Sequence, residues 1–196
     1  PADAAILTQW DASTPLWHAT LVLGRRADLL VIDDTNIVYD GWVTRERPKI
    51  DRIACPWLIA RFIDPDAEFL YVAPTRVMAT ARAKQATPYD VPDVRFSHEG
   101  DRCSFDAFLD HYRLKDPALC ELALIVRGAD TDELDLAPQA AGLLAISLGL
   151  SRLFQDDQAL LREGMVVYDA LYRWCKDGKE EVHTWNPDGY RLAAGN

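Results

Sequence analysis

The strongest constraint on the fold is a helical periodicity of apolar residues in the second half of the chain. The aromatic and aliphatic residues between Phe105 and Tyr112 follow the i, i+3, i+4, i+7 spacing that places side chains on one face of an α-helix. Ser104 is a suitable N-cap for this helix, and Asp116 followed by proline predicts the start of a second. Two further helices are expected, one from Pro138 and one from Met165 to Cys175. The chain is therefore predicted to be helix-dominated after residue 100.

Extended segments are predicted mainly in the first half. Phe69–Val72 and Val94–Ser97 have the composition of strands, and an Ala-, Lys- and Arg-containing helix is expected near residues 75–85 between them. Three short extended runs precede them: Ala19–Leu23, Asp28–Ile32 and Ile37–Tyr39. Together these patterns predict an α+β fold, a single helix-dominated domain with a small β-sheet from the N-terminal half.

The same patterns divide the chain into three parts. Residues 1–41 are expected to form an N-terminal β extension, residues 42–175 the main domain, and residues 176–196 a polar tail. In the main domain Gly142 and Gly149 lie seven residues apart on one predicted helix, a spacing that suggests close contact with another helix.

Charge and hydropathy exclude several classes of function. The chain has 21 Lys and Arg against 31 Asp and Glu, a formal net charge of -10, so its average field repels phosphate backbones and we expect no direct DNA binding by this chain alone. No apolar run approaches the roughly 20 residues of a membrane span, and the first ten residues lack the features of a signal peptide. We therefore expect a cytoplasmic protein without a membrane partner. Four cysteines without a CxxC pair indicate neither a disulfide scaffold nor a zinc ribbon.

One short segment reverses the sign of the overall charge. Four basic residues against two acidic ones give a local charge of +2 in the segment made by Arg45, Glu46, Arg47, Lys49, Asp51 and Arg52. Arginine side chains bind the oxygens of carboxylate, phosphate, sulfate or chromate in a bidentate manner. The segment is thus a candidate site for a small oxyanion. The alternative is a solvated loop whose arginines pair with the protein's own carboxylates.

A short helix is predicted from about residue 56 to 63, because proline suits a first helical turn and Asp64–Pro65 ends the apolar stretch. Cys55 would then lie at the N-cap, where the helix terminus and Arg52 favour the thiolate. Cys55 is therefore a candidate catalytic thiol. A buried, inert cysteine is the alternative.

His98 is the candidate histidine. It alternates with Val94 and Phe96, so its ring is predicted to face away from bulk water. A divalent metal ion is the one cofactor suggested here, with His98, Glu99 and Asp130 as candidate ligands, although the spacing matches no established metal motif. The alternatives are a core histidine bonded to backbone and, for the acidic run beginning at Asp130, a helix cap. Gly-rich phosphate loops, GxSxG and HExxH motifs do not occur.

Residues 42–59, which read WVTRERPKIDRIACPWLI, resemble the opening of the C-terminal domain of ChrB-type chromate resistance proteins. The resemblance extends over roughly residues 42–175. Its other segments are Ile63–Leu70, Ala86–Asp90, Cys103–Asp106, Ile125–Asp130, Leu136–Arg152 and Tyr168–Trp174.

This resemblance implies a role in chromate resistance and the chromate stress response. It implies a functional set of Arg45, Arg52 and His98 serving an anion, with Cys55 and Asp130 as neighbours. The 41 preceding residues are fewer and more acidic than the family's DNA-binding half, so the resemblance does not extend to transcriptional control by this chain.

Three functions stay open at this point. The first is a domain that binds or senses a small oxyanion such as chromate or sulfate through an Arg/His site. The second is a metal- or thiol-dependent enzyme, redox or hydrolytic, acting on a small anionic substrate. The third is a structural partner domain, and homodimer formation is also left open.

Overall fold

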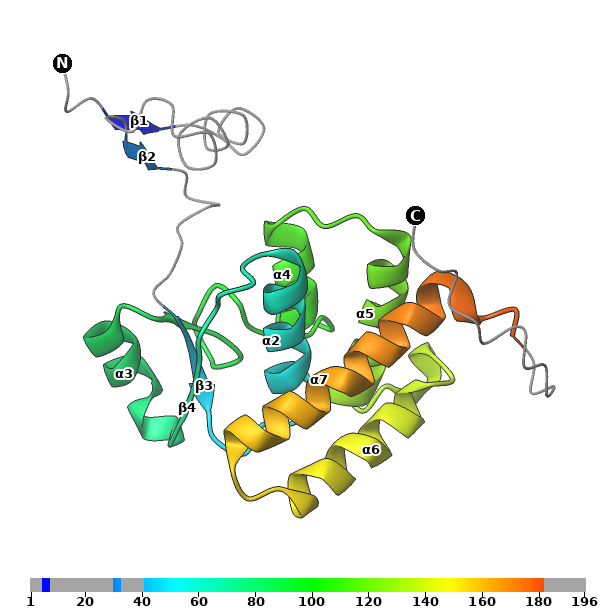
Figure 1. Ribbon diagram of the computed structural model, residues 1–196. Helices are drawn as coiled ribbons and strands as arrows, with labels where there is room; N and C mark the ends of the chain where they lie inside the picture. The colour runs from blue at the N-terminus through cyan, green and yellow to red at the C-terminus, as the bar shows by residue number, and fades with distance from the viewer. Residues whose placement is uncertain (1–4, 8–29, 33–40, 182–196) are drawn as a thin grey trace.

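The protein is described here by a computed structural model, which covers residues 5–7, 30–32 and 41–181. Helices predominate after residue 100, which confirms the predicted α+β, helix-dominated class (Figure 1). The longer helices are α2 (Asp51–Phe62), α3 (Val77–Lys84), α4 (Ser104–His111), α5 (Pro117–Asp130), α6 (Ala140–Leu153) and α7 (Asp157–Arg173). Shorter helical turns are η2 (Pro74–Arg76), η3 (Leu134–Leu136) and the π-helical turn η4 (Trp174–Gly178).

The main sheet is small and parallel. Strand β3 (Trp42–Arg45) lies between β4 (Phe69–Val72) and β5 (Thr87–Pro88), with Trp42 opposite both Phe69 and Thr87. A separate parallel pair joins β1 (Ala5–Leu7) to β2 (Leu30–Ile32). The sequence patterns missed the central strand β3, because its run of buried residues leads directly into the charged segment. They also missed the short strands β1 and β5.

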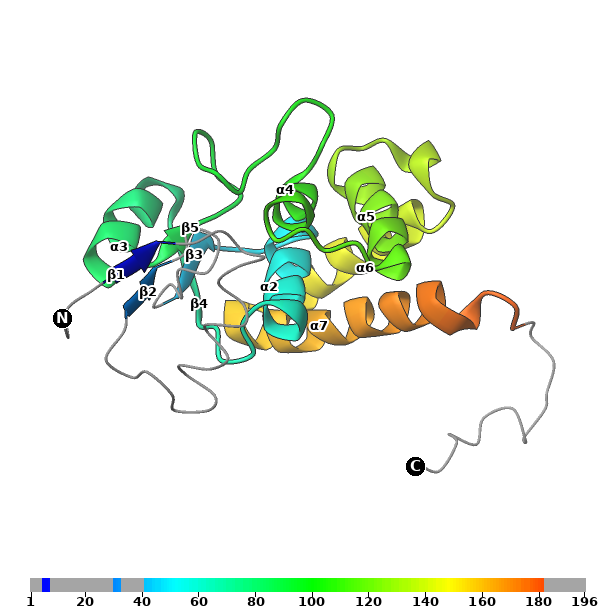
Figure 2. The same ribbon diagram turned by 90° about the horizontal axis from the view of Figure 1, so that it is seen from above.

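The side chains of β3 alternate between two cores. Val43 faces α3 and packs in a small cluster with Val77 and Ala81. Trp42 faces the other way, into the main core, where its ring centroid lies 5.5 Å from that of Phe96 and 5.3 Å from that of Phe108. Helix α3 therefore covers one face of the sheet while α2 and α4 lie on the opposite side, with α5 and α6 beyond them (Figure 2). Helix α7 runs across α2, and its first turn reaches β4, where the side chain of Gln158 donates to the carbonyl of Phe69.

Helix α2 begins earlier than predicted and runs through a proline. The expected start at residue 56 is wrong, because the helix begins at Asp51. Pro56 has no N–H to donate to the carbonyl of Arg52, which would normally leave that carbonyl without a partner. The hydroxyl of Tyr71 on β4 donates to this carbonyl at 2.7 Å. A tertiary hydrogen bond thus replaces the one that proline removes.

Other predicted boundaries have mixed outcomes. Strand Phe69–Val72 is confirmed, and Asp116 caps α5 by accepting from the backbone N–H of Ala118 at 2.8 Å. The predicted strand Val94–Ser97 is wrong, because only Phe96 forms a bridge, to Tyr89. The N-cap of α4 is Cys103, one residue before the predicted Ser104. Of the N-terminal runs, Leu30–Ile32 forms β2, and Ala19–Leu23 and Ile37–Tyr39 lie outside the described residues.

The glycines that allow close helix contact are not the predicted pair. A Cβ added at Gly142 or Gly149 would meet nothing within 4 Å. A Cβ at Gly128 would instead lie 2.9 Å from the Cβ of Ala140, and one at Gly164 would lie 2.8 Å from Cγ2 of Ile53. The close approaches are therefore between α5 and α6 and between α7 and α2. Within the described part of the chain, no helix is long and apolar enough to cross a membrane.

Candidate functional site

A cluster of charged side chains forms where four segments of the main domain meet. Arg45 ends β3, Asp51 begins α2, and Asp130 ends α5. The fourth segment is the loop between β5 and α4, which contributes Asp90 and His98. Because β3 and β5 are parallel neighbours, Arg45 and Asp90 lie at the same, carboxyl-terminal edge of the sheet, the edge at which open α/β sheets usually bind ligands.

Arg45 and Arg52 form the basic half of this cluster, and both contact the carboxylate of Asp90. The carboxylate is only 5% exposed, and its Oδ2 lies 2.8 Å from Nη2 of Arg45 and 3.3 Å from Nε of Arg52. Its Oδ1 accepts from the hydroxyl of Ser104 at 2.9 Å and lies 3.5 Å from Nε2 of His98. Burial alone would raise the pKa of Asp90, but the hydrogen bonds with His98 and Arg45 and the charges of the two arginines outweigh it and lower that pKa.

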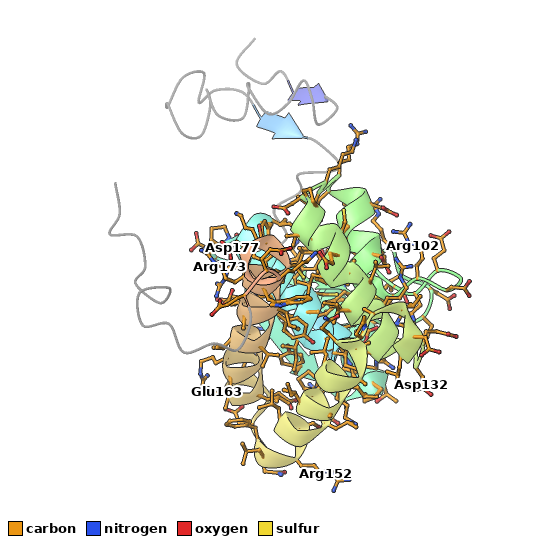
Figure 3. All side chains as sticks on the ribbon, turned by 90° about the vertical axis from the view of Figure 1, so that its right-hand side faces the viewer. Arg102, Asp132, Arg152, Glu163, Arg173 and Asp177 are labelled. Carbon is orange, nitrogen blue, oxygen red and sulfur yellow. The ribbon has the colours of Figure 1, made fainter. Side chains whose placement is uncertain are left out.

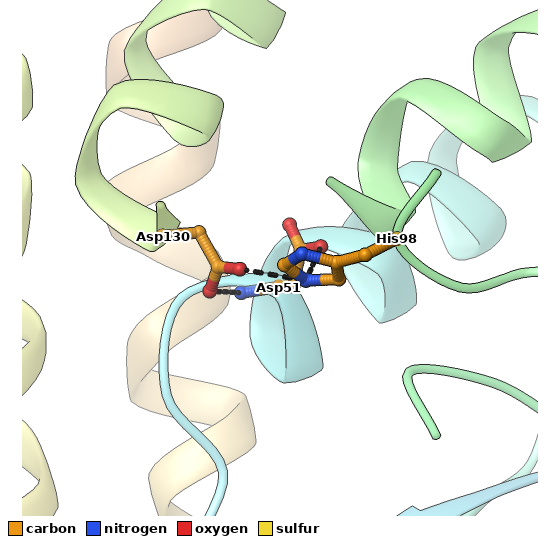
Figure 4. Close-up of side chains that lie close together, drawn as sticks. All are labelled: Asp51, His98 and Asp130. Carbon is orange, nitrogen blue, oxygen red and sulfur yellow. Dashed lines mark hydrogen bonds and ion pairs between the residues drawn. The ribbon is translucent and has the colours of Figure 1, made fainter. Parts of the chain in front are cut away.

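Asp51, His98 and Asp130 form the acidic half. Nε2 of His98 lies 3.0 Å from Oδ2 of Asp130 and 3.8 Å from Oδ2 of Asp51, and the three side chains point toward one another (Figure 4). Oδ2 of Asp51 also accepts from the backbone N–H groups of Ser104 and Phe105 at the start of α4. Oδ1 of Asp51 is buried and has no hydrogen-bond partner among the described residues.

The proximity of these groups changes their pKa values. Burial, reinforced by the charges of Asp130 and Asp90, raises the pKa of Asp51 well above its ordinary value. The pKa of Asp130 is raised by burial and by the charge of Asp90. The pKa of His98 is raised to about 9, mainly by the hydrogen bond with Asp90. Partial burial acts in the opposite direction, and the charges of Asp51 and Asp130 raise this pKa further. Three carboxylates thus surround one imidazole, and the positive charge of His98 offsets part of their mutual repulsion.

An unusual backbone conformation positions Asp51. The preceding residue, Ile50, has φ 32° and ψ -97°, a region that β-branched residues rarely adopt. Tertiary hydrogen bonds hold it there, since its N–H donates to the hydroxyl of Ser147 at 3.1 Å and its carbonyl accepts from the hydroxyl of Tyr168 at 3.0 Å. Strain of this kind is concentrated at functional sites in proteins, and here it precedes the most buried carboxylate of the cluster.

Most, but not all, of the predicted ligands come together. Arg45, Arg52, His98 and Asp130 meet in this cluster. Arg47 instead points to the end of α6, where its guanidinium donates to the carbonyls of Ser151, Phe154 and Gln155. Its role there is to satisfy the last carbonyls of a helix.

Two details predicted for the metal candidates are corrected by the structure. Glu99 is exposed and forms a backbone bridge to Arg102, so it is not part of the cluster. The side chain of His98 is 41% exposed, because the loop that carries it is not a strand and the predicted alternation does not apply. Its imidazole faces the carboxylates on one side and solvent on the other.

Asp51 and Asp90 are the members that the sequence patterns missed. Asp51 was counted only as a charge offsetting the arginines, and Asp90 stood in a loop without a motif. A signal for Asp90 did exist, since a carboxylate directly after a short parallel strand lies at the ligand-binding edge of a sheet. No local signal predicted that Asp51, Asp90 and Asp130 would meet.

Cys55 does not have the environment expected of a reactive thiol. It lies in the second turn of α2, not at the N-cap, and it is fully buried. Burial, with the charge of Asp51 adding to it, raises the pKa of the Cys55 thiol well above its ordinary value. The expected stabilisation by the helix terminus is absent because the helix begins four residues before it.

The basic half of the cluster opens to solvent. A pocket of about 420 Å³ is lined by Arg45, Asp90, His98, Ser97 and residues 91–93. The side chain of Arg45 is 36% exposed and donates only to Asp90 among the described residues, which leaves guanidinium N–H groups available. Chemically, the site offers fixed cationic donors at its mouth and carboxylate and imidazole ligands at its base.

Comparison with known proteins gives one consistent match. The family described as ChrB, C-terminal domain, matches residues 42–175. The chain is also similar to the protein named Protein ChrB of Cupriavidus metallidurans (strain ATCC 43123 / DSM 2839 / NBRC 102507 / CH34), at 36% identity over 137 residues. That match covers 68% of this chain and 41% of the relative, so the chain spans about two fifths of the relative's length. No solved structure matches. All the charged residues of the cluster lie within the matched range.

Proposed function

The chain belongs to the ChrB C-terminal domain family, which is associated with chromate resistance, and on that premise we propose that it binds a small tetrahedral oxyanion, chromate or sulfate-like, at Arg45, Arg52 and His98. The observation that carries the proposal is the convergence of these three cationic side chains, from three segments, on the single carboxylate of Asp90 beside an open pocket.

Asp90 orients the donors in this proposal. A dianion that leaves water must be met by several fixed N–H groups, and arginines held by a buried carboxylate are preorganised to supply them. Arg52 is further fixed by its hydrogen bond to the carbonyl of Glu46 at 3.1 Å. Arg45 and His98 both line the pocket, where an oxyanion would contact the exposed part of each side chain.

The protein's own carboxylates limit the affinity. Three cations and three carboxylates compete within the cluster, so an added dianion gains less than it would from arginines alone. We therefore expect dissociation constants between about 1 μM and 1 mM, equivalent to roughly -8 to -4 kcal/mol.

Calorimetric titration of the metal-free protein with sulfate and with chromate tests the proposal. Sulfate has the same shape and charge but is not an oxidant, so it separates binding from oxidation. Arg52→Ala is expected to weaken binding by about 10- to 100-fold, the range for losing hydrogen bonds to a charged group. Arg82→Ala, at an exposed position of α3 outside the cluster, is the matched control and should leave affinity unchanged.

Two results would contradict the oxyanion site. One is the absence of binding heat with both anions at millimolar concentration. The other is equal affinity in the wild type and in Arg52→Ala. At position 45 the better variant is Arg45→Lys, because removing the charge would also leave buried Asp90 with one ion pair fewer. Lysine keeps the positive charge but lacks the planar, bidentate guanidinium, so the affinity for the anion should still fall.

The proposed anion ligands lie on three separate segments, which favours a sensing role. Arg45, Arg52 and His98 belong to β3, α2 and the loop before α4, so an anion that contacts all three would hold these segments together. Slower amide hydrogen exchange in residues 89–103 on sulfate addition would support sensing. The thiol-dependent enzyme alternative loses its main argument with the burial of Cys55.

A further inference from the structure

We infer that Asp51, His98 and Asp130 form a binding site for one divalent transition metal ion of the Zn²⁺ or Mn²⁺ class, at the base of the cluster. This inference does not rest on the oxyanion proposal, because it concerns a ligand of opposite charge and two further carboxylates. The two proposals share His98, whose imidazole would be a neutral ligand of the metal ion and a cationic donor to the anion, so they describe different protonation states of that side chain. The metal site rests on the geometry of three ligand atoms and on one buried oxygen that the protein does not satisfy.

The spacing of the three side chains fits a shared ion. One ligand atom from each residue lies within 4.8 Å of the others, and Nε2 of His98 is 3.0 Å from Oδ2 of Asp130 and 3.8 Å from Oδ2 of Asp51. Ligands about 2.0–2.2 Å from a common ion are separated by roughly 3–3.5 Å, so small side-chain movements suffice.

The unpartnered oxygen of Asp51 is the second observation. Asp51 is only 1% exposed, and its Oδ1 accepts no hydrogen bond from the described residues. A buried carboxylate oxygen without a partner is costly, and its neighbours Asp90 and Asp130 add repulsion. A cation bound by Asp51 would offset the repulsion, and it would supply the missing partner if Oδ1 coordinated it.

The backbone already holds both carboxylates in place. Oδ2 of Asp51 accepts from the N–H groups of Ser104 and Phe105, and Oδ1 of Asp130 lies 3.4 Å from the N–H of Asp51. Hydrogen bonds of this kind orient metal ligands in known sites. The backbone conformation of Ile50, with φ 32°, sets the direction in which α2 begins at Asp51.

The ligand types select the class of ion. Two carboxylates and one imidazole suit Zn²⁺ or Mn²⁺, whereas Mg²⁺ and Ca²⁺ prefer oxygen ligands alone. Three protein ligands leave at least one coordination position for water, on the side where His98 is 41% exposed. The thiol of Cys103 lies close to Asp51 and hydrogen-bonds Asp106 at 3.5 Å, and it is not among the three residues whose ligand atoms converge.

The test is titration of the metal-free 196-residue chain with Mn²⁺, Zn²⁺ and Mg²⁺ in a buffer without oxyanions. Binding is measured by calorimetry and, for Mn²⁺, by electron paramagnetic resonance. We expect one Mn²⁺ or Zn²⁺ per chain, bound at least about 10-fold more tightly than Mg²⁺. Mn²⁺ is the decisive probe because the exposed thiol of Cys120 can hold Zn²⁺ loosely but has little affinity for Mn²⁺.

Two substitutions and one control identify the site. His98→Ala lies in a partly exposed loop and should fold, and Asp51→Asn keeps the shape of the side chain; each should weaken Mn²⁺ binding by on the order of 100-fold. Glu99→Gln, next to His98 in sequence but outside the cluster, should bind as the wild type does.

Three results would overturn the inference: no saturable Mn²⁺ or Zn²⁺ binding below about 100 μM, unchanged affinity in folded His98→Ala, or equal losses in Glu99→Gln. Mg²⁺ binding as tight as Mn²⁺ binding would overturn the assigned class of ion. Since no oxyanion is present in these titrations, failure of the metal site and failure of the oxyanion site are separate outcomes.

Discussion

Single residues in this protein differ sharply in how their buried polar atoms are satisfied. The indole N–H of buried Trp57 donates to Oδ1 of Asp169 at 2.8 Å, and Arg61 donates to both oxygens of the same carboxylate at 3.0 and 2.8 Å. Asp51 has the opposite character, with one oxygen bonded and one left unpartnered. Both oxygens of Asp169 are thus paired within the protein, whereas Asp51 keeps one oxygen that could accept a further ligand, as the proposed metal site requires.

The first prediction concerns the pH dependence contributed by Asp169. The pKa of Asp169 is lowered, mainly by the hydrogen bonds from Arg61. Partial burial acts in the opposite direction, and the hydrogen bond from Trp57 lowers this pKa further. A lowered pKa in the folded state adds stability that is present above the unfolded value of about 4 and is lost as pH falls through the folded value. Because Asp169 is 42% exposed, solvent screens the pair, so Asp169→Asn should cost only about 0.5–1 kcal/mol at pH 7.

Denaturant unfolding at pH 7 and at pH 3 measures this effect. The difference between wild type and Asp169→Asn should shrink at the lower pH, and a constant difference would contradict the assignment. Asp169→Leu is the informative companion, since it also leaves the Trp57 N–H without an acceptor and should cost about 1–3 kcal/mol more.

The second prediction at this scale is an order of thiol reactivity. Cys55 is fully buried with a raised pKa, whereas Cys120 is the exposed member of the four cysteines. Iodoacetamide should therefore label Cys120 first and Cys55 only on unfolding. Mass spectrometry of the labelled peptides provides the measurement, and labelling of Cys55 ahead of Cys120 in the folded protein would restore the reactive-thiol hypothesis.

Helices are held to one another through small residues and through backbone carbonyls. Gly164 of α7 lies directly against Ile53 of α2, and Arg47 joins the segment before α2 to the end of α6. The N–H of Arg47 also donates to the carboxylate of Asp157, at the start of α7, at 3.1 Å. The segment that positions Asp51 is thus fixed by two helices distant in sequence, which is why Arg47 belongs to the scaffold of the site.

A matched pair of glycine substitutions tests the helix contacts. The Cβ of Gly164→Ala would lie 2.8 Å from Cγ2 and 3.2 Å from Cδ1 of Ile53, so α7 must move away and stability should fall by about 1–3 kcal/mol. Gly142→Ala places its Cβ in open space on α6 and should gain up to about 1 kcal/mol from helix propensity. Thermal unfolding of both variants is the measurement, and a stabilised Gly164→Ala would contradict the packing.

The whole molecule separates an aromatic and aliphatic interior from a charged exterior. Phe96 and Phe108 stack with centroids 4.2 Å apart at the centre of the main core. Charged side chains such as Arg102, Glu163 and Arg173 project outward from the helical part (Figure 3). With a net charge of -10, the field outside the cluster is expected to be negative on average.

The prediction at this scale is the absence of intrinsic affinity for duplex DNA. The acidic balance of the chain opposes the many phosphate contacts that duplex binding needs, and a single small cluster of basic residues does not supply them. Fluorescence anisotropy with a labelled duplex at low salt should show no binding in the micromolar range. Salt-sensitive binding at that affinity would show that the charge argument fails.

Local signals in the sequence were sufficient for several elements. Asp116 and Pro117 predicted the start of α5 because an N-cap carboxylate and a first-turn proline act within a few residues. The run Phe69–Val72 predicted β4 for the same reason. The basic character of the segment around Arg45 and Arg52 was likewise visible in composition alone. These features depend on neighbours along the chain, so the chain by itself determines them.

Tertiary contacts decided the rest. In helix α2 the hydroxyl of Tyr71 supplies the hydrogen bond that Pro56 removes. The guanidinium of Arg47 lies apart from the charged cluster because it donates to carbonyls at the end of α6. Asp51 and Asp130 are 79 positions apart and meet because α2 and α5 pack in one core. Which carboxylates surround His98 depends on these long-range approaches, and no periodicity or spacing encodes them locally.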